Sequence, residues 1–138
     1  ARSARLVPAP MMPSTGPGSK PRSFNACCRA LRSASVKGRD SVARYGGEEF
    51  AIILPVTAIS GARTVVDNIR EEFAAKERVL KESGEEMPQI TVSFGIAQLR
   101  EEDDFTSLVA RADASLYAAK RAGRNCTMAD ADVTANQA

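Results

Sequence analysis

A glycine pair between two strand-like runs is the feature that most constrains what this chain can fold into. Residues 41–45 form a short strand-like run, and residues 50–54 form an apolar run that is typical of a buried strand. Because glycine takes positive φ angles without steric cost, Gly46 and Gly47 predict a tight β-hairpin between the two runs. Such a short connection requires the two strands to pair antiparallel.

Two adjacent carboxylates, those of Glu48 and Glu49, follow the glycines at the edge of this predicted turn. Carboxylate oxygens are hard ligands that suit Mg²⁺ or Mn²⁺, and a turn without side chains lets phosphates approach the backbone. An ordinary solvated hairpin is an equally good interpretation of these residues taken alone. The rest of the chain decides between the two interpretations.

Two helices and one more strand are predicted downstream of the hairpin. A helical period starts at Thr57, and a second one covers residues 105–122 and ends at Gly123, a natural helix stop. The first apolar stripe consists of Ala62, Val65, Val66, Ile69 and Phe73. The second consists of Phe105, Leu108, Val109, Ala112, Leu116 and Ala119. Between them, alternating apolar residues predict a strand over residues 89–99, preceded by a charged loop at residues 82–86.

These elements predict an α/β sandwich of the α+β type. The 41–54 hairpin and the 89–99 strand are expected to belong to one largely antiparallel central sheet, with both helices packed against it. Gly95 inside the strand predicts a bulge or a close backbone contact.

Two cations, Lys120 and Arg124, lie near the end of the second predicted helix, spaced so that both can point to one side. The simpler interpretation is that they complement the negative end of the helix dipole. The alternative is an anion site, because Lys and Arg are apt partners for phosphate groups.

The first part of the chain differs in composition from the rest. The first 44 residues hold nine of the 19 Lys and Arg residues but only one of the 17 Asp and Glu residues, and five of the seven prolines lie at positions 8–21. Residues 1–24 are therefore predicted to be a disordered or non-native basic leader. A nucleic-acid-binding arm is the alternative, but the segment has neither interleaved aromatic residues nor a known fold motif, so no nucleic-acid partner is expected.

Histidine is absent, which excludes Ser-His-Asp and Cys-His mechanisms and a histidine-ligated zinc. The three cysteines, with Cys27 and Cys28 adjacent, form no paired framework and fit a reduced, cytoplasmic protein. No apolar run approaches membrane-spanning length, so no membrane segment is expected in this chain.

Three motifs in order carry a resemblance to a known family. They are residues 44–50 (RYGGEEF), 90–97 (ITVSFGIA) and 112–125 (ADASLYAAKRAGRN). From about Asn25 to about Met128 the chain resembles the later part of the GGDEF domain of diguanylate cyclases. The resemblance implies a fold like that of nucleotidyl cyclases and polymerase palm domains. Residues 25–128 are then expected to form a partial GGDEF domain, and residues 129–138 a flexible tail.

The function implied by the resemblance is condensation of two GTP molecules into cyclic di-GMP with Mg²⁺ or Mn²⁺. Catalysis would need a homodimer, and the parent protein would carry a sensory or regulatory domain. Glu48 would be the catalytic metal ligand and Glu49 its companion. The implied substrate-binding residues are Gly46 and Gly47 at the turn and Lys120 and Arg124 at the triphosphate.

The chain also departs from the family pattern. Before its hairpin the family has an Asp-x-Asp-x-Phe-Lys type strand, which supplies a metal ligand, and an Asn-Asp-x-x-Gly-His-x-x-Gly-Asp stretch, which holds guanine. Neither occurs here, and Asp40 is the one acidic residue among the first 44. We therefore expect the first part of the domain to be missing or replaced, through truncation or a change of reading frame, and this chain to be inactive or nearly so. The alternative is a non-catalytic, degenerate GGDEF module that acts as a nucleotide receptor or a protein-interaction domain.

Many GGDEF proteins carry an Arg-x-x-Asp motif before the hairpin, where cyclic di-GMP binds and inhibits. The corresponding positions here are Lys37 and Asp40. Lysine keeps the charge but lacks the planar guanidinium that pairs with phosphate and stacks on guanine. A degenerate inhibitory site with weak product binding is expected.

Overall fold

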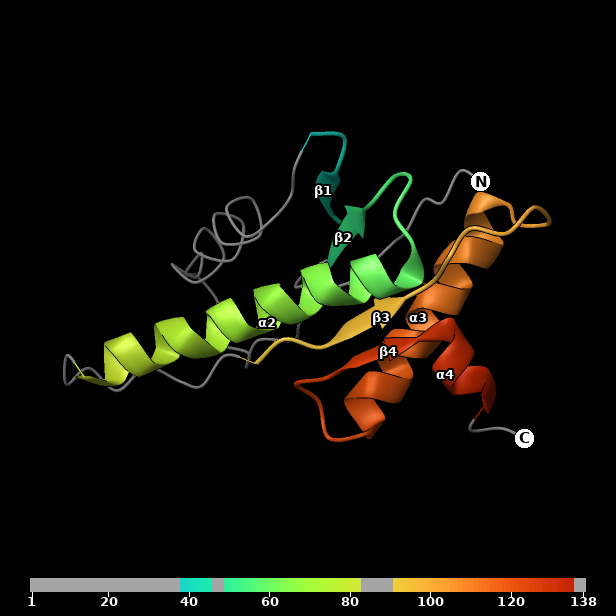
Figure 1. Ribbon diagram of the computed structural model, residues 1–138. Helices are drawn as coiled ribbons and strands as arrows, with labels where there is room; N and C mark the ends of the chain where they lie inside the picture. Colours follow the sequence, from blue (N-terminus) through green and yellow to red (C-terminus); the bar gives the residue numbers. More distant parts are fainter. Residues whose placement is uncertain (1–37, 46–48, 83–90, 136–138) are drawn as a thin grey trace, which may run out of the picture.

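The structure, a computed structural model, describes residues 38–45, 49–82 and 91–135 (Figure 1). The predicted leader, residues 1–24, lies outside these ranges, as do Cys27 and Cys28. The described elements are β1 (Ser41–Arg44), β2 (Phe50–Ile53), α2 (Ile59–Glu82), β3 (Phe94–Ile96), α3 (Phe105–Arg121), β4 (Thr127–Ala129) and α4 (Asp130–Ala135).

The predicted antiparallel hairpin is confirmed. Strand β1 pairs with β2 in a register that runs from Ser41 opposite Ile53 to Arg44 opposite Phe50. Beyond the last ladder pair, the Tyr45 N–H donates to the Glu49 carbonyl at 2.9 Å. Three residues therefore connect the two sides of the hairpin, one more than the glycine pair alone.

The strands lie between helices α2 and α3, because alternate side chains of β2 enter two different core clusters. Phe50, Ile52 and Leu54 pack with α2, and Ala51 packs with α3. Strand β3 contributes to the same two faces, with Phe94 and Ile96 toward α2 and Ala97, just after the strand, toward α3. The α2 residues of the first cluster are Ala62, Val66, Ile69 and Phe73, with Val65 partly buried against them. The predicted sandwich of strands and packed helices is confirmed, and Figure 1 shows α2 crossing in front of the strands with α3 behind β3.

The prediction of one largely antiparallel sheet is wrong for the described residues. The hairpin forms one two-stranded sheet, and β3 pairs in parallel with β4 in another, from Phe94 opposite Thr127 to Ile96 opposite Ala129. Strands β2 and β3 share a layer through side-chain packing, but no described strand lies hydrogen-bonded between them. Helix α3 supplies the long crossover that parallel pairing of β3 with β4 requires.

Gly95 was predicted to mark either a bulge or a close backbone contact, and the structure shows the close contact. A Cβ atom built on Gly95 would lie 2.3 Å from the Leu116 N atom and 2.4 Å from the Ala112 O atom. Real Cβ atoms do not approach backbone this closely, so only glycine lets β3 lie directly on α3.

Helix α3 has well-defined ends. Asp104 is the N-cap, and its carboxylate accepts from the Ser107 N–H at 2.7 Å while the Ser107 hydroxyl accepts from the Asp104 N–H. At the other end Gly123 has a φ of +109°, and the Arg124 N–H donates back to the Ala119 carbonyl at 3.1 Å. Gly123 is thus the predicted stop. Phe105 does not join the apolar face as expected: it is 69% exposed, because the first residue of α3 extends past the core.

Three predicted boundaries differ from the structure. Helix α2 continues through Glu82, where the loop was expected to begin, and residues 83–86 lie outside the described ranges. Regular strand structure covers Phe94–Ile96 rather than the whole 89–99 run. The expected flexible tail, residues 129–138, instead has Ala129 in β4 and residues 130–135 in α4, with Asp130 buried.

Buried ion pairs explain why the segment after β4 is ordered. Arg111 on α3 contacts the carboxylates of Asp103 and Asp130 and donates to the Gln98 carbonyl at 2.9 Å. Arg100 adds a contact to Asp130 at 3.2 Å. We call Arg100, Asp103, Arg111 and Asp130 the Arg111 cluster. It fastens α4 and the segment before α3 to one edge of that helix.

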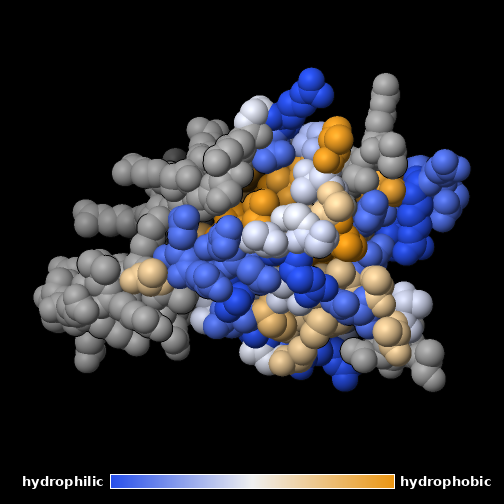
Figure 2. Space-filling model, viewed as in Figure 1, coloured by the Kyte–Doolittle hydropathy of each residue, from blue (hydrophilic) through white to orange (hydrophobic). Residues whose placement is uncertain are grey.

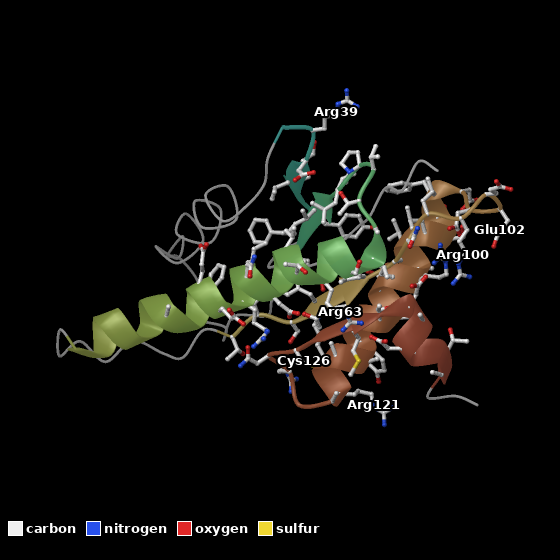
Figure 3. All side chains as sticks on the ribbon, viewed as in Figure 1. Arg39, Arg63, Arg100, Glu102, Arg121 and Cys126 are labelled. Carbon is white, nitrogen blue, oxygen red and sulfur yellow. The ribbon has the colours of Figure 1, made fainter. Side chains whose placement is uncertain are left out.

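A second polar link joins α2 to β4 and α4. Arg63 pairs with the Asp132 carboxylate, and the Thr127 hydroxyl donates to Asp67 at 2.9 Å. Figure 3 shows Arg63 where α2 passes β4. Figure 2 shows hydrophilic atoms along α2 and apolar surface around the hairpin and the start of α2, where Ile53 and Val56 are exposed.

Candidate functional site

The hairpin brings Glu49 to the beginning of β2. The backbone bond between Tyr45 and Glu49 fixes this position, and the next residue, Phe50, is buried in the core. The Glu49 side chain is 38% exposed, so its carboxylate remains within reach of a ligand. Gly46, Gly47 and Glu48, which were predicted to contact nucleotide and metal, lie outside the described residues.

The end of α3 provides the predicted cations. Lys120 lies in the last helical turn, and Arg124 follows Gly123 in a left-handed conformation with a φ of 62°. Asn125, with a φ of 48°, donates its N–H to the hydroxyl of buried Ser93 at 3.0 Å. This hydrogen bond anchors the turn that carries Arg124 to the segment leading into β3.

The structure brings two of the predicted site residues together. The Lys120 Nζ atom lies 3.4 Å from the Glu49 Oε1 atom, although 71 residues separate them in the sequence. The Lys120 side chain is 20% exposed, so its ammonium is only partly solvated. This contact joins the hairpin motif to the helix motif and places a cation of a type that suits phosphates beside a carboxylate of a type that suits metals.

Asp113 is a further charged residue at this site, and it was not among the site residues predicted from the sequence. Burial raises the pKa of the Asp113 carboxyl above its ordinary value, and the Glu49 carboxylate raises it further, while Lys120 acts in the opposite direction. Asp113 therefore lies within the electrostatic field of both partners. The available signal was its spacing of seven residues from Lys120, which places both on the same side of a helix.

The available donors fit a divalent cation in type. Glu49 and Asp113 offer carboxylate oxygens, which Mg²⁺ and Mn²⁺ prefer. Within the described ranges, however, the structure contains no group of three or more His, Cys, Asp and Glu residues that could hold a metal ion. Glu48, the residue predicted to be the principal ligand, lies outside those ranges.

The predicted inhibitory pair is only half described. Lys37 lies outside the described residues, and Asp40 directly precedes β1. Two residues before Asp40, Gly38 has a φ of +65°, which marks the turn into the strand.

In this chain, helices pack on both faces of a strand layer, and a hairpin carboxylate lies next to a lysine at a helix end. Residues 22–126 match the family described as diguanylate cyclase, GGDEF domain. The chain therefore belongs to the GGDEF family. The resemblance inferred from about Asn25 to about Met128 is confirmed.

Relatives agree with this assignment. The chain is 43% identical over 95 residues to the diguanylate cyclase VdcA of Vibrio cholerae, covering 65% of this chain and 27% of that protein. It is 38% identical over 104 residues to the response regulator PleD of Caulobacter vibrioides, covering 74% of this chain and 23% of that protein. The chain thus spans about a quarter of the length of these two relatives.

Solved structures show the same fold. The GGDEF domain of DgcB from Caulobacter crescentus, solved in complex with c-di-GMP, is 28% identical with a TM-score of 0.70. That comparison covers 94% of this chain and 78% of the solved chain. In the part of this chain that the structure describes, no helix is long and apolar enough to cross a membrane.

Proposed function

We propose that this chain carries the hairpin and triphosphate-binding parts of a diguanylate cyclase site. The observation that supports this most strongly is the 3.4 Å contact between Lys120 and Glu49, because it joins the two motifs in space. In the complete domain the substrate is GTP and the product is cyclic di-GMP. Each 3′-hydroxyl attacks the α-phosphate of the other GTP, and pyrophosphate leaves.

Each proposed site residue has a role that follows from its chemistry. Lys120 and Arg124 bind the β- and γ-phosphates through charge-assisted hydrogen bonds. Glu48, with Glu49 as its companion, would hold Mg²⁺ or Mn²⁺, which neutralises phosphate charge and lowers the pKa of the attacking hydroxyl. Gly46 and Gly47 leave the backbone of the turn open to the nucleotide.

The reaction joins two nucleotides, so two domains must face each other. We therefore propose a homodimer as the active state and a sensory or regulatory domain in the parent protein that controls its formation. The relatives' greater length is consistent with additional domains.

We further propose that this chain makes little cyclic di-GMP. Two metal ions beside a triphosphate need several carboxylate ligands, and the hairpin supplies only those of Glu48 and Glu49. The lack of the early Asp-x-Asp-x-Phe-Lys type motif in the sequence favours the second candidate, a non-catalytic nucleotide receptor. The altered inhibitory pair, Lys37 and Asp40, is expected to bind product weakly.

The direct test is to incubate the chain with GTP and Mn²⁺ and to follow cyclic di-GMP by chromatography. Little product is expected from this chain, whereas the same region joined to a complete first half of the domain should be active. In that completed domain Glu48→Gln should abolish turnover without unfolding the protein, because it keeps size but removes charge. Robust turnover by the present chain that is lost on Glu48→Gln would show that a residue in the first 40 replaces the missing aspartate.

Nucleotide binding tests the receptor function separately. Replacing Lys120 or Arg124 by alanine should weaken GTP and ATP about equally, by roughly 1–3 kcal/mol per charge-assisted contact. Isothermal titration calorimetry measures both ligands. A strong preference for GTP over ATP would contradict the proposal that the guanine-reading residues are missing.

A further inference from the structure

One edge of α3 carries both Asp113 and Lys120. Seven residues are close to two full helical turns, so these side chains leave the helix in nearly the same direction. Glu49 approaches this edge from the start of β2, with its Oε1 atom 3.4 Å from the Lys120 Nζ atom. Asp113 interacts electrostatically with both partners. The Lys120 ammonium therefore lies next to one carboxylate, that of Glu49, and about two helical turns from a second, that of Asp113.

Asp113 is offset in part by Lys120, though not through a direct contact. Asp113 neither accepts a hydrogen bond nor forms an ion pair within the described ranges, while Lys120 is already paired with Glu49. The other described elements packed on α3 do not compensate the charge of Asp113. The described β3 and β4 contain no charged residue, and the α4 carboxylates, Asp130 and Asp132, pair with arginines elsewhere.

We propose that Asp113 is a specificity-determining residue of the triphosphate site, whose charge excludes metal-free triphosphate and favours triphosphate that carries a divalent cation. This inference rests on the proposed function, in which Lys120 binds the phosphates. Asp113 would let the site discriminate between metal-bound and metal-free triphosphate. Lys120 and Arg124 cannot do this, because two cations alone would bind the more highly charged, metal-free form at least as well.

The selection follows from the local charges. A triphosphate that approaches Lys120 also approaches Glu49 and Asp113, and both carboxylates repel it. A divalent cation on the phosphates offsets this repulsion, since it lowers the ligand's negative charge and attracts both carboxylates. Two helical turns span about 10 Å, close to the Debye length of about 8–10 Å, so physiological salt screens the repulsion from Asp113 in part.

The experiment measures binding of inorganic tripolyphosphate to the full chain by calorimetry, once in excess EDTA and once in excess Mg²⁺. Asp113→Asn removes the charge and keeps the shape. It should tighten metal-free binding about three- to tenfold and change Mg²⁺-bound binding less, as expected for removal of one partly screened charge. The ratio of the two affinities should therefore fall toward one.

Glu102→Gln is the matched control. Glu102 is an exposed acidic residue before the other end of α3, as Figure 3 shows, and its replacement makes the same change in net charge. It should leave the ratio of affinities unchanged. Circular dichroism checks that each variant is folded, and Asp113→Ser is a second variant for the same measurement.

Lys120→Ala separates the two proposals. If it leaves tripolyphosphate binding unchanged, the phosphates do not bind at Lys120, and both the proposed function and this inference fail. If it weakens binding while Asp113→Asn and Asp113→Ser keep the wild-type ratio, or weaken both ligand forms alike, this inference alone is overturned. The second pattern would identify Asp113 as a residue that merely holds Lys120 in place.

Discussion

The two charged edges of helix α3 differ in how completely their charges are paired. On one edge Arg111 contacts Asp103, Asp130 and the Gln98 carbonyl, and the side chains of Asp103 and Asp130 are only 4% and 9% exposed. On the other, Lys120 contacts Glu49 at 3.4 Å. The first edge holds three segments of chain together, whereas the second leaves charge available to a ligand.

The pKa directions show the same contrast. At Asp103, burial raises the pKa, but hydrogen bonds from the Arg100 N–H, Ser107 and Arg111 outweigh it, so the pKa is below its ordinary value. At Asp113, burial and the Glu49 carboxylate raise the pKa. A lowered carboxyl pKa stabilises the folded state at neutral pH, and a raised one costs stability. A carboxylate whose charge lowers stability and that lies on the same helix side as a cation is typical of a functional site. A cluster in which each charge has a partner is typical of a structural site.

The largest expected effect on stability comes from the edge of α3 that carries the Arg111 cluster. Arg111→Met keeps the side-chain volume but leaves Asp130 buried without its principal cation. We expect the free energy of unfolding to fall by about 2–4 kcal/mol, somewhat below the value for a fully buried pair because the Arg111 side chain is 21% exposed. Chemical denaturation monitored by circular dichroism measures this change.

Two variants sharpen this test. Arg121→Met, on the exposed side of the same helix, should change stability by less than about 0.5 kcal/mol. Adding Asp130→Asn to Arg111→Met should recover part of the loss, because it removes a buried charge that only the partly exposed Arg100 still pairs among the described residues. If Arg111→Met is no worse than Arg121→Met, the cluster does not hold α4 in place.

The next effect concerns the face of α3 between the two edges. Gly95→Ala would place a Cβ atom 2.3 Å from the Leu116 N atom, so the helix must move away from β3. We expect a loss of about 1–3 kcal/mol, typical of overpacking in a core. Because this displacement moves both edges together, tripolyphosphate binding should weaken as well. Unchanged stability would show that β3 and α3 separate at little cost.

Periodicity predicted the core of this fold but not the two edges. The apolar stripe of α2 and the buried residues of α3 follow from spacing, since burial of one helix face is a local pattern. The pairing of β3 with β4 and the ordering of α4 depend on contacts distant in sequence. Arg111 reaches Asp130, and Arg63 reaches Asp132, so a tail without apolar periodicity is held by charge.

The same distinction applies to the candidate site. The motif residues Lys120 and Glu49 were predicted individually, and their 3.4 Å contact is a property of the fold. Asp113 was missed because an exposed helical aspartate is ordinarily a solvated residue; its significance depends on Glu49, which comes from another element.

Acid titration should distinguish the carboxylates of the structural ion pairs, Asp103 and Asp132, from Asp113 by the sign of the change in stability. The pKa of Asp132 is lowered by hydrogen bonds from the Ala129 N–H and from Arg63, and that of Asp103 is also lowered. In both cases the unfolded chain takes up a proton at higher pH than the folded protein. Their stabilisation is therefore complete above the unfolded aspartate pKa, near 3.9, and is lost as the pH falls through the lower folded values.

The measurement is the free energy of unfolding against pH, for the wild type and for Asp132→Asn. The variant should be less stable at neutral pH and should lose less stability on acidification. Parallel curves for the two proteins would show that the Arg63–Asp132 pair does not contribute through its charge.

The smallest expected effect has the opposite sign and concerns Asp113. Its pKa is raised in the folded state, so the folded protein takes up this proton before the unfolded chain as the pH falls. Ionised Asp113 therefore costs stability at neutral pH, and Asp113→Asn should raise the free energy of unfolding by a few tenths of a kcal/mol, about 0.2–0.5, because solvent screens this exposed carboxylate. The gain should shrink as the pH falls through the folded pKa, where the wild-type residue is protonated as well. A loss of stability in Asp113→Asn at pH 7 would mean that the carboxylate is a structural partner of Lys120, and the contrast between the two edges of α3 would not hold.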